Sequence, residues 1–151
     1  MKYNLATYSW DEKEKEAIQE IMDTDMYSMG EKVKQFENKF SEYVGSKYSV
    51  MVNSGSSANL LMIASLIYSE KLKRGDEVIV PSVSWSTTYF PLLQYGLKVK
   101  FLDIDINTLN INLVKEAITD KTKLIFVVNL LGNPNNFNKI KETIGGGALF
   151  L

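Results

Sequence analysis

The stretch Arg74-Gly-Asp-Glu-Val-Ile-Val-Pro81 indicates the fold class of this 151-residue chain. Its first three residues form a turn signal, an unbroken apolar run follows, and Pro81 ends that run. A second run, Leu124-Ile-Phe-Val-Val128, is also apolar throughout. Strands that are buried on both faces have this composition, and they occur in parallel sheets covered by helices. We therefore predict a parallel sheet in this part of the chain.

Further strand and helix patterns alternate on both sides of these two runs. The predicted strands cover residues 48–52, 77–80, 99–102 and 123–128. The predicted helices are one after Ser9, a second through Tyr43, then 56–68, 87–95, a short one around 113–118, and 135–144. This order predicts βαβ units, so the fold class is α/β, with a mostly parallel sheet flanked by helices.

Several single residues refine these boundaries. Ser9 and Glu12 have the spacing of a capping box at the start of the first helix. Gly45 stands where a helix C-terminal glycine is expected. Pro91 is predicted to strain or shorten its helix, because proline lacks the backbone N–H group. At the end of the chain, Ala148-Leu-Phe-Leu151 is predicted to begin another strand.

The composition excludes several kinds of chemistry. The formal net charge is −1, which does not predict a nucleic-acid surface, and no long apolar segment predicts a membrane span. The absence of cysteine excludes disulfides and thiolate catalysis. The absence of histidine removes the usual general base and the commonest metal ligand, and no metal site is predicted. The first ten residues do not resemble a signal peptide, so we expect a cytoplasmic location.

Two segments that follow predicted strands carry the strongest site signals. In Asn53-Ser-Gly-Ser-Ser-Ala58, a helix begins at Gly55, Ser56 and Ser57, where free N–H groups favour a phosphate. The alternative is that Ser56 or Ser57 only caps the helix. Trp85 follows the next strand, where its ring could lie over a flat heteroaromatic ligand or simply pack against the protein.

Three further segments leave more than one interpretation open. Asp103 and Asp105 could bind a metal ion, but turn and cap roles are favoured. The loop of residues 129–134, with Gly, Pro and two Asn, could contact a ligand or serve only as a turn. The polar and aromatic loop of residues 25–30 could reach a ligand or only connect two helices.

Taken together, these segments resemble the DegT/DnrJ/EryC1/StrS family of sugar aminotransferases. The resemblance runs through nearly the whole chain in one order. Its specific stretches are Met29-Gly-Glu31, Phe36-Glu37, Gly45-Ser-Lys-Tyr48, Met51-Val-Asn-Ser-Gly-Ser-Ser-Ala-Asn-Leu-Leu-Met62, Pro81-Ser-Val-Ser-Trp-Ser-Thr-Thr88, Phe101-Leu-Asp-Ile-Asp-Ile-Asn-Thr-Leu-Asn-Ile111 and Asn129-Leu-Leu-Gly-Asn-Pro-Asn-Asn-Phe137. The resemblance implies the PLP-dependent aspartate aminotransferase (type I) fold. Residues 1–151 would be the amino-terminal part of its large, pyridoxal phosphate (PLP)-binding domain, without the remainder of that domain or the small domain.

The resemblance also assigns roles to individual residues. Gly55, Ser56 and Ser57 would hold the cofactor phosphate, and Trp85 would stack on the pyridine ring. The loop formed by Asp25, Met26, Tyr27 and Ser28 would contact the substrate. The family further implies a homodimer and a cofactor that receives its amino group from glutamate to give the pyridoxamine form.

Within the family, the chain is most similar to a dehydratase branch acting on GDP-linked 4-keto-6-deoxy sugars. That activity is 3-dehydration in deoxysugar synthesis of the O-antigen, or lipopolysaccharide, type. The alternatives are a nucleotide-sugar aminotransferase, or a non-catalytic remnant or partner of an intact homologue. The family's catalytic base and its acidic partner of the pyridine nitrogen belong to segments absent from these 151 residues. We therefore assign no catalytic residue and expect a truncated, inactive form.

Overall fold

A computed structural model of the chain describes residues 7–113 and 115–151. The chain divides into two compact units, Met1–Met51 and Val52–Leu151. The helices are α1 (Glu12–Met22), α2 (Glu31–Val44), α3 (Gly55–Tyr68), α4 (Ser86–Gln94) and α5 (Phe137–Ile144), with 3-10 turns at Lys115–Ala117 and Leu130–Gly132. The strands are β1 (Glu77–Pro81), β2 (Lys98–Leu102), β3 (Thr122–Ile125) and β4 (Leu149–Phe150).

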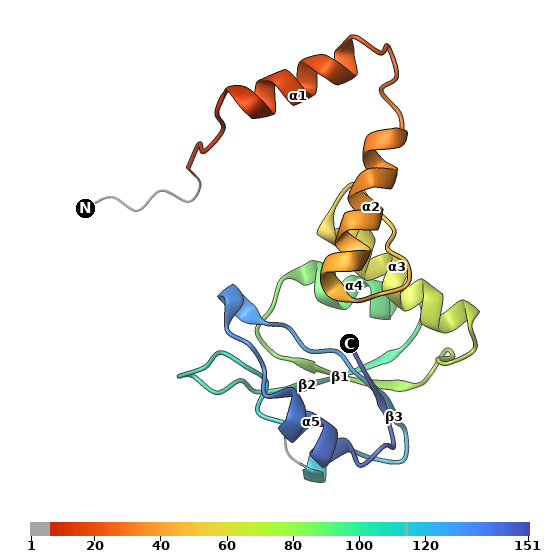
Figure 1. The fold of residues 1–151 in the computed structure, drawn as a ribbon. Coiled ribbons are helices and arrows are strands. Elements are labelled where there is room, and N and C mark those ends of the chain that lie inside the picture. The colour runs from red at the N-terminus through yellow and green to blue at the C-terminus, as the bar shows by residue number, and fades with distance from the viewer. Residues whose placement is uncertain (1–6, 114) are drawn as a thin grey trace. The chain divides into compact units, whose positions relative to one another are not determined.

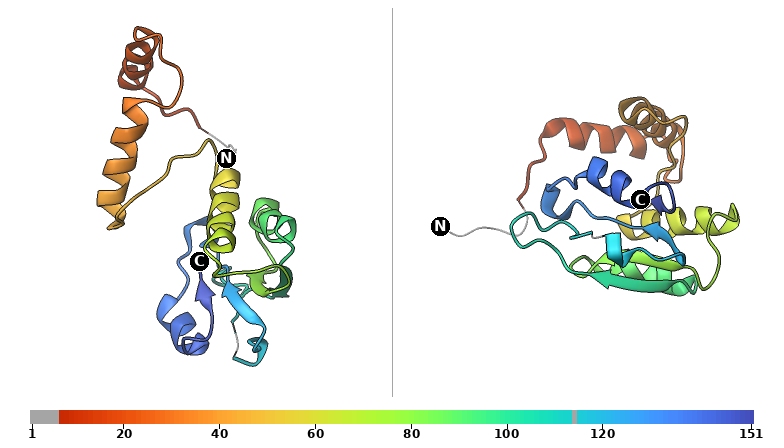
Figure 2. Two further views of the ribbon diagram at one scale, coloured as in Figure 1. Left: turned by 90° about the vertical axis from the view of Figure 1, so that its right-hand side faces the viewer. Right: turned by 90° about the horizontal axis from the view of Figure 1, so that it is seen from below.

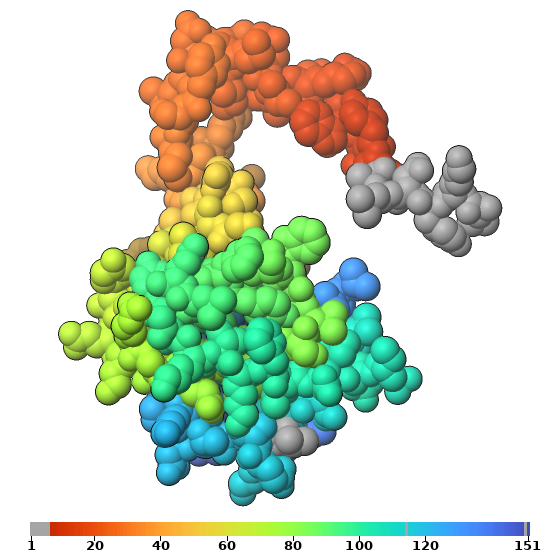
Figure 3. All heavy atoms as spheres, turned by 180° about the vertical axis from the view of Figure 1, so that it is seen from behind, coloured from red at the N-terminus to blue at the C-terminus, as the bar shows by residue number. Residues whose placement is uncertain are grey.

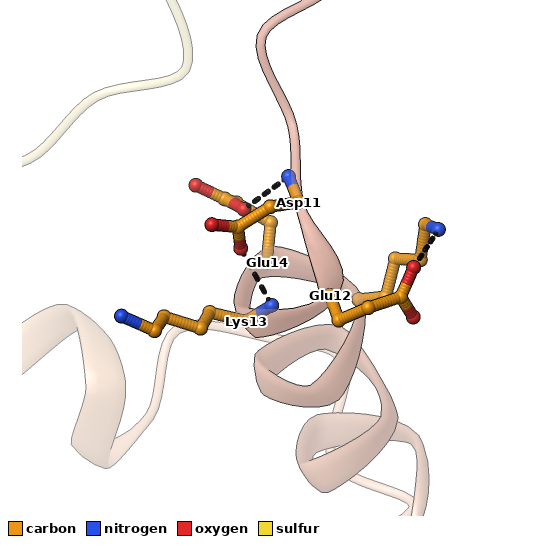
Figure 4. Close-up of polar contacts among 5 residues, drawn as sticks. Asp11, Glu12, Lys13 and Glu14 are labelled. Atoms are coloured by element: carbon orange, nitrogen blue, oxygen red, sulfur yellow. Dashed lines mark hydrogen bonds and ion pairs between the residues drawn. The ribbon is translucent and has the colours of Figure 1, made fainter.

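The first unit contains the helices α1 and α2. The capping box of α1 is formed by Asp11 and Glu14, as Figure 4 shows: Lys13 N donates to Asp11 Oδ1, and Asp11 N donates to Glu14 Oε2, both at 2.8 Å. The predicted box of Ser9 and Glu12 is therefore wrong. Both pairs have the required spacing, and aspartate caps a helix as well as serine, so local sequence could not separate them.

Of the two predictions for the end of α2 and the segment after it, one is confirmed and one is wrong. Gly45 ends α2 in the left-handed region, with φ 69°, as predicted. The strand predicted over residues 48–52 is wrong, because no regular structure forms there and the side chains of Tyr48 and Val50 are exposed. A strand requires a paired neighbour, and a local apolar pattern does not show whether one is present.

The second unit is built on a parallel sheet with the strand order β2-β1-β3-β4. The predicted strands 77–80 and 99–102 are confirmed. The strand predicted over 123–128 is shorter, since β3 ends at Ile125. The strand start predicted at the end of the chain is confirmed as β4.

Each face of the sheet has its own hydrophobic core. Val78, Val80 and Leu124 point to the α3 and α4 side, whereas Ile79 and Ile125 point to the α5 side. This alternation follows from the two-residue period of a strand. Figures 1 and 2 show α3 and α4 on one side of the sheet and α5 on the other. The prediction of strands buried on both faces is therefore confirmed.

The helices of this unit largely follow their predicted ranges. Pro91 lies inside α4 without shortening it, because the helix continues to Gln94. The helix α4 packs beside β2, and Figure 3 shows this face of the unit. The short helix predicted around 113–118 is only a 3-10 turn at Lys115–Ala117, and its residue 114 lies outside the described residues. Asn136 caps α5 by accepting from Lys139 N.

Candidate functional site

The start of α3 presents unpaired hydrogen-bond donors. Ser54 is the N-cap, and its hydroxyl accepts from Ser57 N at 3.2 Å, so neither Ser56 nor Ser57 is the capping residue. The amides of Gly55 and Ser56 precede the first intrahelical acceptor, and no other acceptor in the described part of the chain contacts them. These two amides and the partial positive charge of the helix start are suited to an anion.

The space beside Gly55 is open. A Cβ atom added to Gly55 would have no neighbour within 4 Å, and the residue does not adopt a left-handed φ. Glycine is therefore not required here by the fold of the chain itself. Its small size leaves room next to the open amides, and this arrangement fits a phosphate group.

Trp85 lies at the carboxyl end of β1, directly before α4. It is the N-cap residue of α4 but makes no side-chain capping bond, and its side chain is 76% exposed. A tryptophan ring that is this exposed contributes little to the core and leaves much of its surface free to stack on a flat ligand. Its position also matches the edge at which open α/β sheets bind ligands.

A cavity of about 190 Å³ lies between α3 and α4. Its lining consists of Ser56, Ser57, Leu60, Thr87, Phe90, Pro91 and Gln94. The structure thus brings Ser56 and Ser57 against the first turns of α4. Neither Gly55 nor Trp85 lines this cavity, so a single pocket shared by all four predicted residues stays a prediction.

Sequence reasoning did not single out the residues that α4 contributes to the cavity. Thr87, Pro91 and Gln94 are spaced by four and three positions, which places them on one helical face. That spacing could have identified these residues as one face of a helix. What the sequence did not reveal is that this face meets the start of α3.

The loop predicted to contact substrate belongs to the first unit. Met26, Tyr27 and Ser28 line a cavity of about 490 Å³ between α1 and α2, whereas Asp25 does not line it. Asp25 adopts a left-handed φ of 53°, and its carboxylate accepts from Tyr27 Oη at 3.0 Å. This bond orders the loop from within. Substrate contact by the loop stays a prediction.

The other two candidate segments are ordered by turn hydrogen bonds. Asp105 Oδ1 accepts from the amides of Thr108 and Asn107, and these bonds lower the pKa of the Asp105 carboxyl. Asn129 Oδ1 accepts from both the amide and the side chain of Asn135, which closes the loop after β3. Within residues 7–113 and 115–151, no group of three His, Cys, Asp or Glu could hold a metal ion, and no helix could cross a membrane.

The fold is a parallel α/β unit, and its site combines the open start of α3 with an exposed tryptophan. The sequence profile of the DegT/DnrJ/EryC1/StrS aminotransferase family matches residues 9–147, and the chain belongs to this family. Within it, the chain is 61% identical to the GDP-4-keto-6-deoxy-D-mannose 3-dehydratase of Escherichia coli O55:H7, over 99% of this chain and 39% of that protein. The chain therefore spans about two fifths of the length of this relative.

Solved structures show the same likeness. The crystal structure of GDP-4-keto-6-deoxymannose-3-dehydratase with a trapped PLP-glutamate geminal diamine gives a TM-score of 0.95 at 60% identity, over 99% of this chain and 40% of that one. A mutant of that enzyme with bound GDP-perosamine gives a TM-score of 0.94 at 60% identity, again over 99% and 40%. The fold predicted from the sequence is thus confirmed as that of the PLP-dependent sugar enzymes.

Proposed function

We propose that this chain is the amino-terminal part of a PLP-binding large domain, in an enzyme that removes the 3-hydroxyl group of a GDP-linked 4-keto-6-deoxy sugar. The observation that carries this proposal is the start of α3, where the amides of Gly55 and Ser56 have no acceptor and the Cβ position of Gly55 is unfilled. Family membership and the likeness to the 3-dehydratases support the same conclusion.

Different residues bind the phosphate and the pyridine ring of the cofactor. The amides of Gly55 and Ser56, with the hydroxyl of Ser56, hold the phosphate by hydrogen bonds. The hydroxyl of Ser57 donates to Asn53 Oδ1 at 2.6 Å, so it joins them by exchanging that bond for one to the phosphate. The exposed ring of Trp85 covers one face of the pyridine ring and keeps water from it. When bound, pyridoxal phosphate supplies the electron sink for the elimination, in its pyridoxamine form. The chain's own contribution is to fix the position of the cofactor.

The remaining parts of the proposal concern substrate and assembly. The loop of Asp25, Met26, Tyr27 and Ser28 contacts the GDP-linked sugar, and glutamate supplies the amino group. A homodimer and a cytoplasmic location belong to the same proposal, and both rest on the family. A 3-dehydratase structure that holds a PLP-glutamate adduct and another that holds GDP-perosamine support the choice of ligands.

A fluorescence titration tests the cofactor site. The sequence has two tryptophans, so a Trp10→Phe parent leaves Trp85 as the only indole. We expect pyridoxal phosphate to quench Trp85 at lower concentrations than pyridoxal, which lacks the phosphate, and Ser56→Ala to reduce this difference. Ser65→Ala is the matched control, because it removes a hydroxyl that bonds only Met62 O within α3. Equal quenching by both compounds would contradict a phosphate site.

A further inference from the structure

Pro91 creates an unusual hydrogen-bonding requirement in α4. In a regular helix the carbonyl of Thr87 would accept from the amide of residue 91, four positions later. Proline has no amide hydrogen, so the regular intrahelical bond to the Thr87 carbonyl is missing. A partly buried carbonyl without a donor is costly. A donor from another element would therefore stabilise this carbonyl.

Asn59 supplies that donor from α3. Its Nδ2 atom donates to Thr87 O at 3.2 Å, and this is the only side-chain hydrogen bond between α3 and α4 in the described part of the chain. Asn59 lies one helical turn after Gly55, and Thr87 lies two residues after Trp85. A single bond thus links the start of α3 to the segment that carries the tryptophan.

We propose that Asn59 is a positioning residue for the cofactor, a role that rests on the proposed function. By holding Thr87, it fixes Trp85 at a set distance from the amides of Gly55 and Ser56. One pyridoxal phosphate can then contact the phosphate donors and the indole ring together. The pairing is specific, because Pro91 removes the donor that α4 would offer this carbonyl and Asn59 provides one from α3.

A double substitution separates positioning from simple stabilisation. All variants carry Trp10→Phe, so that Trp85 alone reports on binding. We expect Asn59→Ala to weaken pyridoxal phosphate binding about tenfold, since it removes one bond of ordinary strength. Pro91→Ala returns an amide donor to Thr87 O within α4. This carbonyl has two lone pairs, so Asn59 keeps its bond in the single Pro91→Ala variant.

The pair Asn59→Ala with Pro91→Ala gives the decisive comparison. In this double variant the Thr87 carbonyl accepts from the new amide of residue 91, so its resistance to urea is expected to match that of Pro91→Ala. Its affinity for pyridoxal phosphate is nevertheless expected to stay about tenfold lower than that of Pro91→Ala. Recovery of affinity together with stability would overturn the proposal, because Asn59 would then only satisfy a carbonyl. Ser65→Ala is expected to change neither quantity.

A measurement without ligand tests the role of Asn59 independently of cofactor binding. The fluorescence anisotropy of Trp85 is expected to fall in Asn59→Ala and to stay low when Pro91→Ala is added. Unchanged anisotropy in both variants would overturn the positioning role even if the cofactor binds. A parent chain that binds no pyridoxal phosphate would overturn the proposed function, whereas the anisotropy would still decide whether Asn59 orders the Trp85 segment.

Discussion

Replacing Gly55 by alanine should move stability and binding in opposite directions. Apart from its chain neighbours and the adjacent backbone of α3, the new methyl group would meet no atom within 4 Å, and the backbone there is not left-handed. Alanine restricts the unfolded chain more than glycine does, so the free energy of unfolding should rise by about 0.4–1 kcal/mol. The same methyl group would occupy the space that we assign to the phosphate. Overpacking typically costs about 1–3 kcal/mol, which corresponds to an affinity loss of about 5- to 150-fold.

Two measurements on Gly55→Ala check this reasoning. Urea unfolding followed by circular dichroism gives the stability, and quenching of Trp85 by pyridoxal phosphate gives the affinity. Gly147→Ala is a suitable control, since its added carbon would meet Ile144 O at an ordinary 3.5 Å and Gly147 does not line the cavity at the start of α3. Unchanged affinity in Gly55→Ala would refute a phosphate at this position. A loss of stability would show that the space beside Gly55 is not open.

Three further outcomes are expected. The hydroxyl of Thr122 donates to Glu77 and, more than its other neighbours, lowers the pKa of that carboxyl. The stability from this bond is therefore present above the ordinary glutamate pKa and is lost as pH falls through the lowered pKa of Glu77. In urea unfolding, Thr122→Val should be less stable than the parent, and this difference in unfolding free energy should shrink below about pH 4. Tyr89→Phe removes the bond from Tyr89 Oη to Pro81 O and should lower the unfolding free energy by about 1 kcal/mol, while an undiminished value would show that this bond does not hold α4 on β1. We assign no catalytic base to these 151 residues, so no turnover of a GDP-linked 4-keto-6-deoxy sugar with glutamate is expected from them, and measurable product would contradict this.

The parts of the fold that depend on local chemistry were predictable from the sequence. The run Val78-Ile-Val80 is apolar at every position because its side chains alternate between two cores, and this pattern identified a strand buried on both faces. Gly45 ended a helix as its type suggests. Residues 48–52 are largely apolar as well but form no strand, since pairing depends on neighbours that a local pattern does not reveal.

The candidate site was predictable only in part, for the same reason. The turn before α3 follows from Ser54 and Gly55, which are close in sequence. The contact between Asn59 and Thr87 joins residues 28 positions apart, and it exists because Pro91 frees a carbonyl on a different helix. The sequence did show Pro91 as a disturbance of its helix. It could not show that a side chain from α3 would compensate for it.

The most direct test of the central claim is to map amide chemical shifts of the ¹⁵N-labelled chain during a titration with pyridoxal phosphate. The account predicts the largest shifts at the amides of Gly55 and Ser56 and at the indole N–H of Trp85, all saturating at one common concentration. Pyridoxal should leave the two amides nearly unchanged. Shifts confined to lysine-rich turns such as Lys71-Leu-Lys73, or no saturable shift at Gly55 and Ser56, would contradict a cofactor phosphate at the start of α3.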